Sequence, residues 1–483
     1  MSEDRVSRAL DALSREPAVS WPEPAAVRQR AVRRRRRRIG APTAAVAVAV
    51  AITLGVALPG SSGPATPAPR VAAGQHVAAH SGVAVQLAAD RTSIAKTDPS
   101  AAAAVARTEQ AFTLALLQHL DASGASGNVV LSPSSVATAL AMLQNGAAGR
   151  TLTEIAHALQ SQNLSTRQQD AGWATLTAEL AAAGKSAGVT LQSANSLWLQ
   201  RGLQMQNPFM AAMARYFDTG VWQVDFEKDL SGATDAINSW TSTHTHGKIT
   251  KLFQPGDIDR TTALVLADAV YFDAAWKYSF VPKLTAPGTF TADDGSKVTV
   301  PFMHLDLENE ANVPGGLLVG GDAGYQAVQL PYKGGRFAAL AIMPTRGSLS
   351  DFVAHLTATR LAAITRSLAP GPVDLRFPKF TLQQYTKLNT TLMAMGMRAA
   401  FSDFADFSAL SRTSLYVQTV AHRAYLKVDE RGTQAAAVTG IALAPTSAVV
   451  ARPLTFDRPF LFLVRDTGTG TALFAAEVRN PAG

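Results

Sequence analysis

The chain has no cysteine among its 483 residues. Disulfide bonds, thiolate metal sites, a cysteine nucleophile and a lipid anchor on cysteine are therefore excluded. The redox compartment stays open, because a protein without thiols is compatible with either side of a membrane. Charged residues are also few, at 17%, whereas apolar residues make up 47%. Such a composition allows a large buried core and excludes a wholly disordered chain.

Positive charge is concentrated at the N-terminus. Of the net charge of +8, residues 1–38 account for +6, with 11 arginines, no lysine and 5 acidic residues, so that only +2 remains for the rest. The high isoelectric point therefore belongs to one short segment, and no nucleic-acid partner is implied. We interpret residues 1–38 as a basic cytoplasmic segment.

An uncharged run of 20 residues, 39–58, follows the arginines directly. A helix of this length spans about 30 Å at ~1.5 Å per residue, which is the thickness of a hydrocarbon core. The positive-inside rule places everything after residue 58 outside the cytoplasm. We favour a retained signal anchor that makes a single pass through the cell membrane. The alternatives are a cleaved signal peptide, which would give a secreted protein, and a buried soluble helix.

Residues 59–103 are rich in proline at their start and in alanine and small polar residues afterwards, which predicts an extracytoplasmic linker. A folded domain is expected from residue 104 to 483. Residues 128–135 predict a short strand running into a helix, with Pro133 in its first turn. Further strands are expected over 190–200, 262–272, 373–382 and 454–464. The run 262–272 is apolar enough to be buried on both faces.

Helices predominate before about residue 250 and strands after it. This order favours an α+β fold in which helices pack on a large antiparallel or mixed sheet. No internal repeat of 20–50 residues is evident, so a solenoid is not favoured.

From residue 104 to 483 the chain resembles the serpin family of serine protease inhibitors. The resemblance rests on the order and spacing of many segments rather than on one motif. They include NVVLSPSSVATALAMLQNGAAG (128–149), INSWTSTHTHGKITKLF (237–253), LVLADAVYFDAAW (264–276), VQLPYKGGRFAALAIMP (328–344) and HRAYLKVDERGTQAAAVTG (422–440). It implies about nine helices packed on three β-sheets and an exposed reactive loop near the C-terminus. We expect a bacterial member that is anchored in the membrane or secreted.

The segment 430–451, ERGTQAAAVTGIALAPTSAVVA, has no charge between Gly432 and residue 451 and holds several poor helix formers. Taken alone, it could be an alanine-rich helix or a plain surface loop. The resemblance implies instead the reactive loop, whose insertion into a sheet is a well-known case of strand addition. After cleavage, Thr433–Thr439 and following residues would enter the main sheet. The hinge implied by the resemblance comprises Glu430, Gly432, Thr433, Gln434, Ala435, Ala436 and Ala437.

Counting along the loop as the resemblance implies places the scissile bond at Thr446–Ser447, to within one or two residues. The residues before it, Ala444-Pro445-Thr446, are small and uncharged, and they do not suit a trypsin-like pocket that binds a cation. Elastase-like or subtilisin-like serine proteases are the expected partners. The alternative is a non-inhibitory serpin that serves as a binding or structural protein.

Serine, aspartate and histidine, the residue types of a hydrolase triad, occur at Ser132, Ser135, Asp268 and His422. No G-x-S-x-G motif accompanies them, so no enzyme is expected. The resemblance implies instead a buried cluster where the main sheet opens, often called the shutter, in which the family usually has Asn at position 268. Because the resemblance implies that it lies beside His422, Asp268 is expected to form an ion pair with a charged imidazolium. The four shutter residues are Ser132, Ser135, Asp268 and His422.

The resemblance also implies a group at the top of the main sheet, the breach, made of Trp276, Lys379 and Glu430. His244 and His246 lack further ligands at metal-binding spacing, so that no metal is expected. We expect no cofactor and no nucleic-acid partner, and a monomeric protein.

Overall fold

The computed structural model of the chain describes residues 84–87, 95–123, 127–217, 221–305, 317–433 and 451–483. Among these residues, no helix is both long and apolar enough to cross a membrane. The run 39–58, which was predicted to do so, lies outside them.

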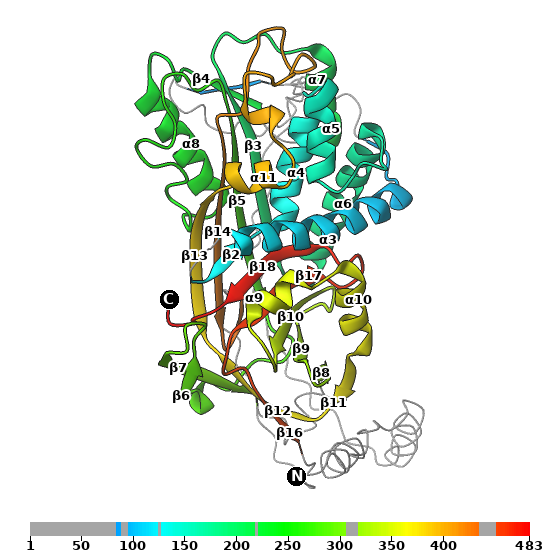
Figure 1. The fold of residues 1–483 in the computed structure, drawn as a ribbon, viewed down its shortest axis with the longest axis vertical. Helices are drawn as coiled ribbons and strands as arrows, with labels where there is room; N and C mark the ends of the chain where they lie inside the picture. Colours follow the sequence, from blue (N-terminus) through cyan, green and yellow to red (C-terminus); the bar gives the residue numbers. More distant parts are fainter. Residues whose placement is uncertain (1–83, 88–94, 124–126, 218–220, 306–316, 434–450) are drawn as a thin grey trace, which may run out of the picture. The chain divides into compact units, whose positions relative to one another are not determined.

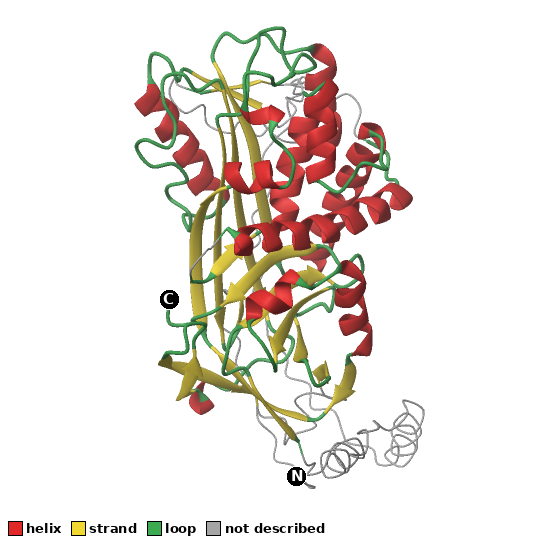
Figure 2. Cartoon of the chain, viewed as in Figure 1, coloured by secondary structure: helices red, strands yellow, loops and turns green. Residues whose placement is uncertain are grey.

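The first sheet contains the longest strands and positions most of the candidate site (Figures 1 and 2). Its central strands β5 and β14 run parallel, whereas β3 and β5 run antiparallel. In spatial order its strands are β1 (Val85–Leu87), β4 (Val221–Val224), β3 (Thr190–Gln200), β5 (Leu264–Ala275), β15 (Gly432–Thr433), β14 (Thr419–Asp429) and β13 (Phe380–Lys387).

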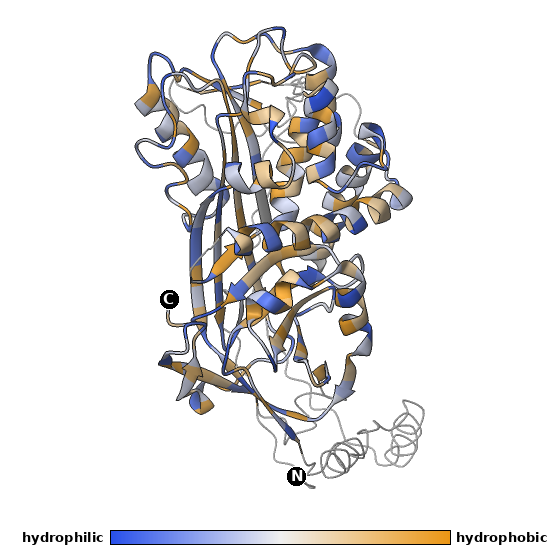
Figure 3. Ribbon diagram, in the orientation of Figure 1, coloured by the Kyte–Doolittle hydropathy of each residue, from blue (hydrophilic) through white to orange (hydrophobic). Residues whose placement is uncertain are grey.

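Two further sheets complete the β structure. The second has seven strands in the order β11 (Ala369–Gly371), β8 (Leu317–Gly321), β9 (Tyr325–Pro331), β10 (Phe337–Pro344), β17 (Phe460–Asp466), β18 (Ala472–Val478) and β2 (Val129–Leu131). The third has four strands in the order β16 (Arg452–Thr455), β12 (Val373–Pro378), β7 (Lys297–Leu305) and β6 (Ala286–Thr291). The three residues of β2, at the edge of the second sheet, are buried. Figure 3 colours the long strands and the helices by hydropathy, with apolar residues in orange.

Nine α-helices occur in the part of the chain that the structure describes, which agrees with the expected α+β class. They are α3 (Pro99–Ala122), α4 (Pro133–Gln144), α5 (Gly149–Ala158), α6 (Thr166–Ala187), α7 (Asn207–Ala212), α8 (Leu230–His244), α9 (Leu349–Ala354), α10 (Ala358–Ser367) and α11 (Asn389–Ala394). Figure 1 shows α8 on one side of the long strands and α4, α5 and α6 on the other.

Strand β5 is buried on both faces, as its apolar sequence predicted. Leu264 and Leu266 belong to the large core shared with α4, while Val265 and Ala267 belong to a smaller core shared with α8. The alternation of side chains along a strand produces this division, because successive residues point to opposite faces of a sheet. A strand covered on both sides needs no polar face.

Several predicted elements are confirmed, and two strands were predicted wrongly. The strand 190–200 has the expected bounds, and residues 128–135 contain β2 followed by α4 with Pro133 at its start. The segment 373–382 is not one strand, because the chain leaves the third sheet after Pro378 and enters the first sheet at Phe380. The segment 454–464 likewise divides between β16 and β17.

Ordered structure also begins before residue 104, inside the segment predicted as a linker. Strand β1 lies at Val85–Leu87, and helix α3 starts at Pro99, where the side chain of Asp98 accepts a hydrogen bond from Ala101 N and caps the helix. The alanines of 100–106 therefore belong to a helix that packs on the core, which their composition alone did not reveal.

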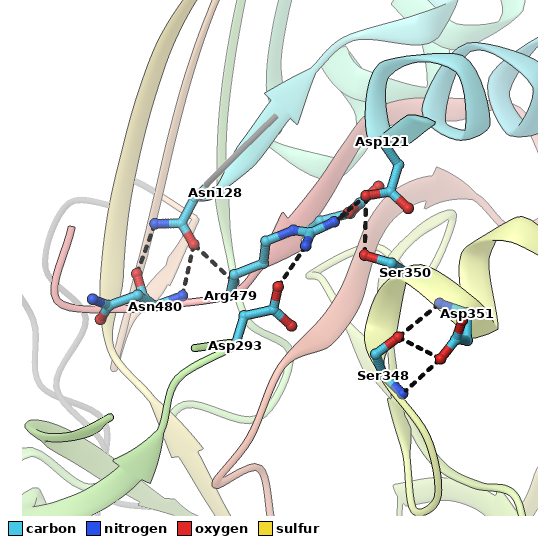
Figure 4. A network of polar contacts seen from close by, with 9 residues as sticks. Asp121, Asn128, Asp293, Ser348, Ser350, Asp351, Arg479 and Asn480 are labelled. Carbon is cyan, nitrogen blue, oxygen red and sulfur yellow. Dashed lines mark hydrogen bonds and ion pairs between the residues drawn. The ribbon is translucent and has the colours of Figure 1, made fainter. Parts of the chain in front are cut away.

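Arg479, just after β18, is bonded to α3 and to the turn after β6 (Figure 4). Its guanidinium binds Asp121 at the end of α3, Asp293 in the turn after β6, and the buried Glu477 of β18. The backbone N–H of Arg479 donates to Asn128 Oδ1 at 2.8 Å. One cation thus joins α3, the third sheet and the second sheet near the C-terminus.

Candidate functional site

The segment predicted to be the hinge begins inside the first sheet. Strand β15 lies between β5 and β14 and runs antiparallel to both. Gly432 is opposite Ala275 on one side and Asp429 on the other, and Thr433 is opposite Ala274 and Val428. Further along, β5 and β14 pair directly with each other over residues 265–270 and 419–424. Gly432 and Thr433 therefore separate β5 from β14 at one end, whereas the two strands pair directly with each other at the other end.

Glycine is required at position 432 by close approach of the neighbouring strand. A Cβ atom on Gly432 would overlap the carbonyl oxygen of Ala274 and crowd the Cα of Ala275. Any side chain at this position would therefore push β15 away from β5.

Thr433 is buried and is fixed by an aromatic pair. Its hydroxyl lies 2.5 Å from the hydroxyl of Tyr332. The ring of Tyr332 stacks on Trp276 with centroids 4.5 Å apart and planes 12° from parallel. Trp276 Nε1 donates to the carbonyl of Asp429 at 2.9 Å, so the stack is also bonded to β14. Burial raises the pKa of Tyr332, which keeps its hydroxyl protonated as a hydrogen-bonding partner.

Glu430, the first residue of the predicted hinge, forms an ion pair with Lys379, whose Nζ lies 3.0 Å from Glu430 Oε2. Thr285 donates to the other carboxylate oxygen of Glu430 at 3.0 Å. Partial burial opposes ionisation of Glu430. The hydrogen bonds from its own backbone N–H, Lys379 and Thr285 nevertheless hold its pKa below the usual value. Because Lys379 is half-exposed, the pair contributes at most ~1 kcal/mol and mainly positions the backbone that leads into β15.

The four predicted shutter residues are brought together at the middle of the first sheet. Ser135 Oγ lies 2.6 Å from Asp268 Oδ1 and 2.7 Å from Asn195 Oδ1. Strand register places Asn195, Asp268 and His422 side by side on β3, β5 and β14. Ser132 and Ser135 lie at the N-terminal end of α4, and all of these residues are buried. Asn195 was not foreseen, although it lies in the predicted strand 190–200.

The expected charged state of His422 is not supported by its hydrogen bonds. The backbone N–H of Ser132 donates to His422 Nε2 at 3.0 Å, which requires an unprotonated Nε2. The remaining proton is then on Nδ1, which faces Asp268 Oδ2 at 3.5 Å. A doubly protonated imidazolium would place two donors against each other. The ion pair predicted from the sequence is therefore replaced by a neutral imidazole beside Asp268.

These contacts do not form a catalytic triad. Both His422 and the two serines are buried, so that a substrate has no access to them. His422 Nε2 is already occupied by a backbone N–H and cannot accept a proton from a serine hydroxyl. The cluster instead links three strands of the sheet to the start of α4.

The remaining predicted residues separate into two groups. Gln434, Ala435, Ala436, Ala437, Thr446 and Ser447 lie outside the described residues. His244 donates from Nδ1 to the carbonyl of Trp240 and packs on its ring, with centroids 4.5 Å apart, and His246 packs on Tyr271. Within the described ranges, no group of three or more His, Asp or Glu side chains is arranged to hold a metal ion.

Comparison with known proteins assigns this arrangement to one family. A family model described as serpin (serine protease inhibitor) matches residues 107–481. Neuroserpin from Rattus norvegicus is 29% identical over 77% of this chain and 90% of its own length. The glia-derived nexin of the same species is 34% identical over 73% of this chain and 88% of its own length.

Solved structures agree with the sequence comparison. The thermophilic serpin tengpin in its native state is 26% identical and superposes with a TM-score of 0.71, covering 82% of this chain and all of that chain. Serpins are generally inhibitors of proteases rather than enzymes, although some are non-inhibitory. With three sheets, nine helices in the described residues and a match to more than three quarters of its length, the chain belongs to the serpin family.

Proposed function

We propose that the protein inhibits serine proteases by trapping them as an acyl-enzyme while its cut loop inserts into the first sheet. The observation that supports this most strongly is β15, which already lies between the parallel strands β5 and β14. An inserted strand that continued β15 would be antiparallel to both neighbours. The loop could therefore enter between β5 and β14 without changing the order of the other strands.

The register of β15 defines which existing pairs insertion must separate. If the strand continues without a bulge, residue 437 reaches the pair of Val270 and Ala424, where direct pairing of β5 with β14 ends. Residue 439 then lies opposite both Asp268 and His422. Insertion as far as Thr439 therefore requires the shutter to open between these two side chains.

Small uncharged residues favour such insertion. A strand of about ten residues forms roughly 20 backbone hydrogen bonds at ~1 kcal/mol each, and insertion breaks those that now join β5 to β14. Ordering the strand costs about 1–2 kcal/mol per residue, so that these two contributions nearly cancel. Burial of side chains then decides the balance, and an unpaired charge would cost several kcal/mol. The sequence from Gly432 to Thr439 contains no such charge.

For the target, we propose an elastase-like or subtilisin-like serine protease that cleaves at Thr446–Ser447. We further propose that the protein is a bacterial serpin acting outside the cytoplasm as a monomer. The run 39–58 would hold it in the cell membrane, or release it if that segment is cleaved. These proposals rest on the residues of the loop and of the N-terminal segment.

The test is incubation with elastase, subtilisin and trypsin, followed by a denaturing gel and mass spectrometry of the cut loop. A covalent complex that survives denaturation is expected with elastase or subtilisin, and a cut between Thr446 and Ala448. Cleavage at that place without any complex would favour the alternative, a non-inhibitory serpin that serves as a binding or structural protein. Trapping of trypsin alone would contradict the proposed target.

A further inference from the structure

Helix α3 lies along the C-terminal strand β18 (Figure 1) and is bonded to it at two places. The N–H of Ala472, at the start of β18, donates to Glu109 Oε2 at 3.2 Å. Just past the other end of the strand, the guanidinium of Arg479 binds both Asp121 of α3 and Glu477 of β18. We propose that Glu109 and Glu477 form a pH-sensitive clamp, which holds β18 against α3 in acid and loosens as the pH rises through neutrality.

The two attachments are matched in spacing. Glu109 and Asp121 are about 18 Å apart along α3 at ~1.5 Å per residue. Ala472 and Glu477 are about 17 Å apart along β18 at ~3.4 Å per residue. Helix and strand can therefore lie side by side with both attachments formed at once. Each attachment contains one carboxyl, of Glu109 or of Glu477, that has almost no contact with solvent.

The carboxyl of Glu109 is 1% exposed and is held by neutral groups. The hydroxyl of Thr113 donates to its Oε1 at 2.9 Å, and the N–H of Ala472 donates to its Oε2. Within the described residues Glu109 has no ion pair. Burial therefore raises its pKa from 4.5 to about 8, despite the two hydrogen bonds.

Water has a short route to Glu109. Both of its hydrogen-bond partners line a cavity of about 220 Å³ beside α10. The charged side chains on this cavity are Arg366 of α10 and Arg465 of β17, and Arg465 donates to Gln329 and Thr365 rather than to Glu109. A small separation of α3 from β18 would therefore hydrate Glu109 and restore its ordinary pKa.

At the other attachment, three carboxyls surround one cation (Figure 4). Arg479 binds Asp121, and it lies 2.6 Å from both Asp293 Oδ2 and Glu477 Oε2. Oε1 of Glu477 is buried and has no hydrogen-bond partner among the described residues. Burial, together with the carboxylates of Asp121 and Asp293, raises the pKa of Glu477 to about 7, although Arg479 opposes this. Ionisation of Glu477 thus leaves a buried group with an excess of negative charge.

The direction of the pH effect follows from linkage. When α3 and β18 separate, both carboxyls are hydrated and take their ordinary pKa of 4.5. The clamp is therefore fully effective below that pH. It weakens as the pH rises toward the values of the closed form, about 7 for Glu477 and about 8 for Glu109. The loosening is local, because β18 keeps its pairing with β17 and β2.

Hydrogen exchange at single amides tests the clamp in the full-length protein at about pH 5.5, 6.5 and 7.5. The N–H of Ala472 reports the contact with Glu109, and the N–H groups of Leu340 and Ala341 in β10 are the internal reference within the same sheet. Each observed rate is divided by the intrinsic rate at that pH. We expect the protection of Ala472 relative to β10 to fall at least about tenfold over this range in the parent.

Matched amide variants assign the effect. Glu109→Gln keeps an acceptor for Ala472 but does not ionise, so the fall in protection should become at least about threefold smaller. Glu477→Gln should reduce the fall in part, and the double variant should abolish it. Glu179→Gln, which replaces a half-exposed carboxyl on α6, should follow the parent.

Equal changes at Ala472 and in β10 across the pH range would overturn the clamp, because the opening would then be global. A Glu109→Gln protein in which Ala472 follows the parent would overturn it as well. If Glu109→Gln does not fold, the comparison of Ala472 with β10 in the parent and in Glu477→Gln still decides the matter. The measurement uses no protease, so its outcome is independent of the inhibitory function proposed above.

Discussion

The hydroxyl of Thr433 lies 2.5 Å from the hydroxyl of Tyr332, inside the first sheet and out of contact with solvent. This bond joins the first residues of the hinge to the stack of Tyr332 on Trp276, and through Trp276 to the backbone of β14. In the mechanism proposed above, Gly432 and Thr433 would therefore already hold their inserted positions before any cleavage, and insertion would continue from residue 434.

The Thr433–Tyr332 bond should contribute measurably to the native form. We expect Thr433→Val and Tyr332→Phe each to lower the free energy of unfolding by about 1–3 kcal/mol, because each leaves a buried hydroxyl without its partner. The double variant should lose less than the sum of the two. Urea unfolding of the four proteins gives the coupling energy, and a coupling near zero would show that the two hydroxyls do not support each other.

Thr433→Arg should abolish inhibition because it disrupts the native form of the uncut protein. Position 433 is already buried against Tyr332, so a charge there acts before any loop insertion. The guanidinium has no room or partner there, so Thr433→Arg should expel β15 and be cleaved as a substrate. The yield of protease complex should fall at least tenfold below that of Thr433→Val, as measured on denaturing gels. Equal yields from the two variants would contradict this account.

Asp268→Asn should stabilise the closed sheet. The single hydroxyl proton of Ser135 faces two acceptors, Asp268 Oδ1 and Asn195 Oδ1. An amide at position 268 could donate to Ser135, which would free that proton for Asn195, and its oxygen could accept from His422 Nδ1. We expect a gain of about 1–2 kcal/mol in urea unfolding at pH 7. Asp235→Asn, at an exposed position of α8, controls for loss of one negative charge, and a destabilised Asp268→Asn protein would refute the argument.

The native form should lose stability as the pH rises through neutrality. Burial raises the pKa of Glu109 from its ordinary 4.5 to about 8, despite hydrogen bonds from Thr113 and Ala472. Burial also raises the pKa of Asp170 and of Glu477 to about 7. Their stabilisation is fully present below the unfolded pKa values and is lost as the pH rises through the folded ones.

The measurement is the free energy of unfolding from about pH 5 to about pH 8.5 in the parent and in Glu109→Gln. The amide retains a hydrogen-bonding side chain that does not ionise, so the decline with pH should be shallower in the variant. Glu179→Gln, which replaces a half-exposed carboxyl on α6, should follow the parent. Superimposable profiles for the parent and Glu109→Gln would exclude Glu109 as a source of the pH dependence.

Local pattern determined much of this protein. The apolar run around Leu266 specified a strand buried on both faces, Pro133 marked the start of α4, and the spacing of segments over 104–483 indicated the family. These features follow from side-chain periodicity and from backbone restrictions that act over a few residues. The uncharged stretch after Gly432 likewise indicated a segment suited to burial.

Only the tertiary structure decided which distant groups meet. The division at Pro378 between two sheets, the addition of β1 to β4, and the contact of Thr433 with Tyr332 depend on strand register between segments far apart in the chain. The neutral form of His422 was also beyond sequence reasoning, because it is set by the backbone N–H of Ser132, and every non-proline residue has that group. The residue type limits which interactions a side chain can form, whereas the fold decides which of the possible partners it contacts.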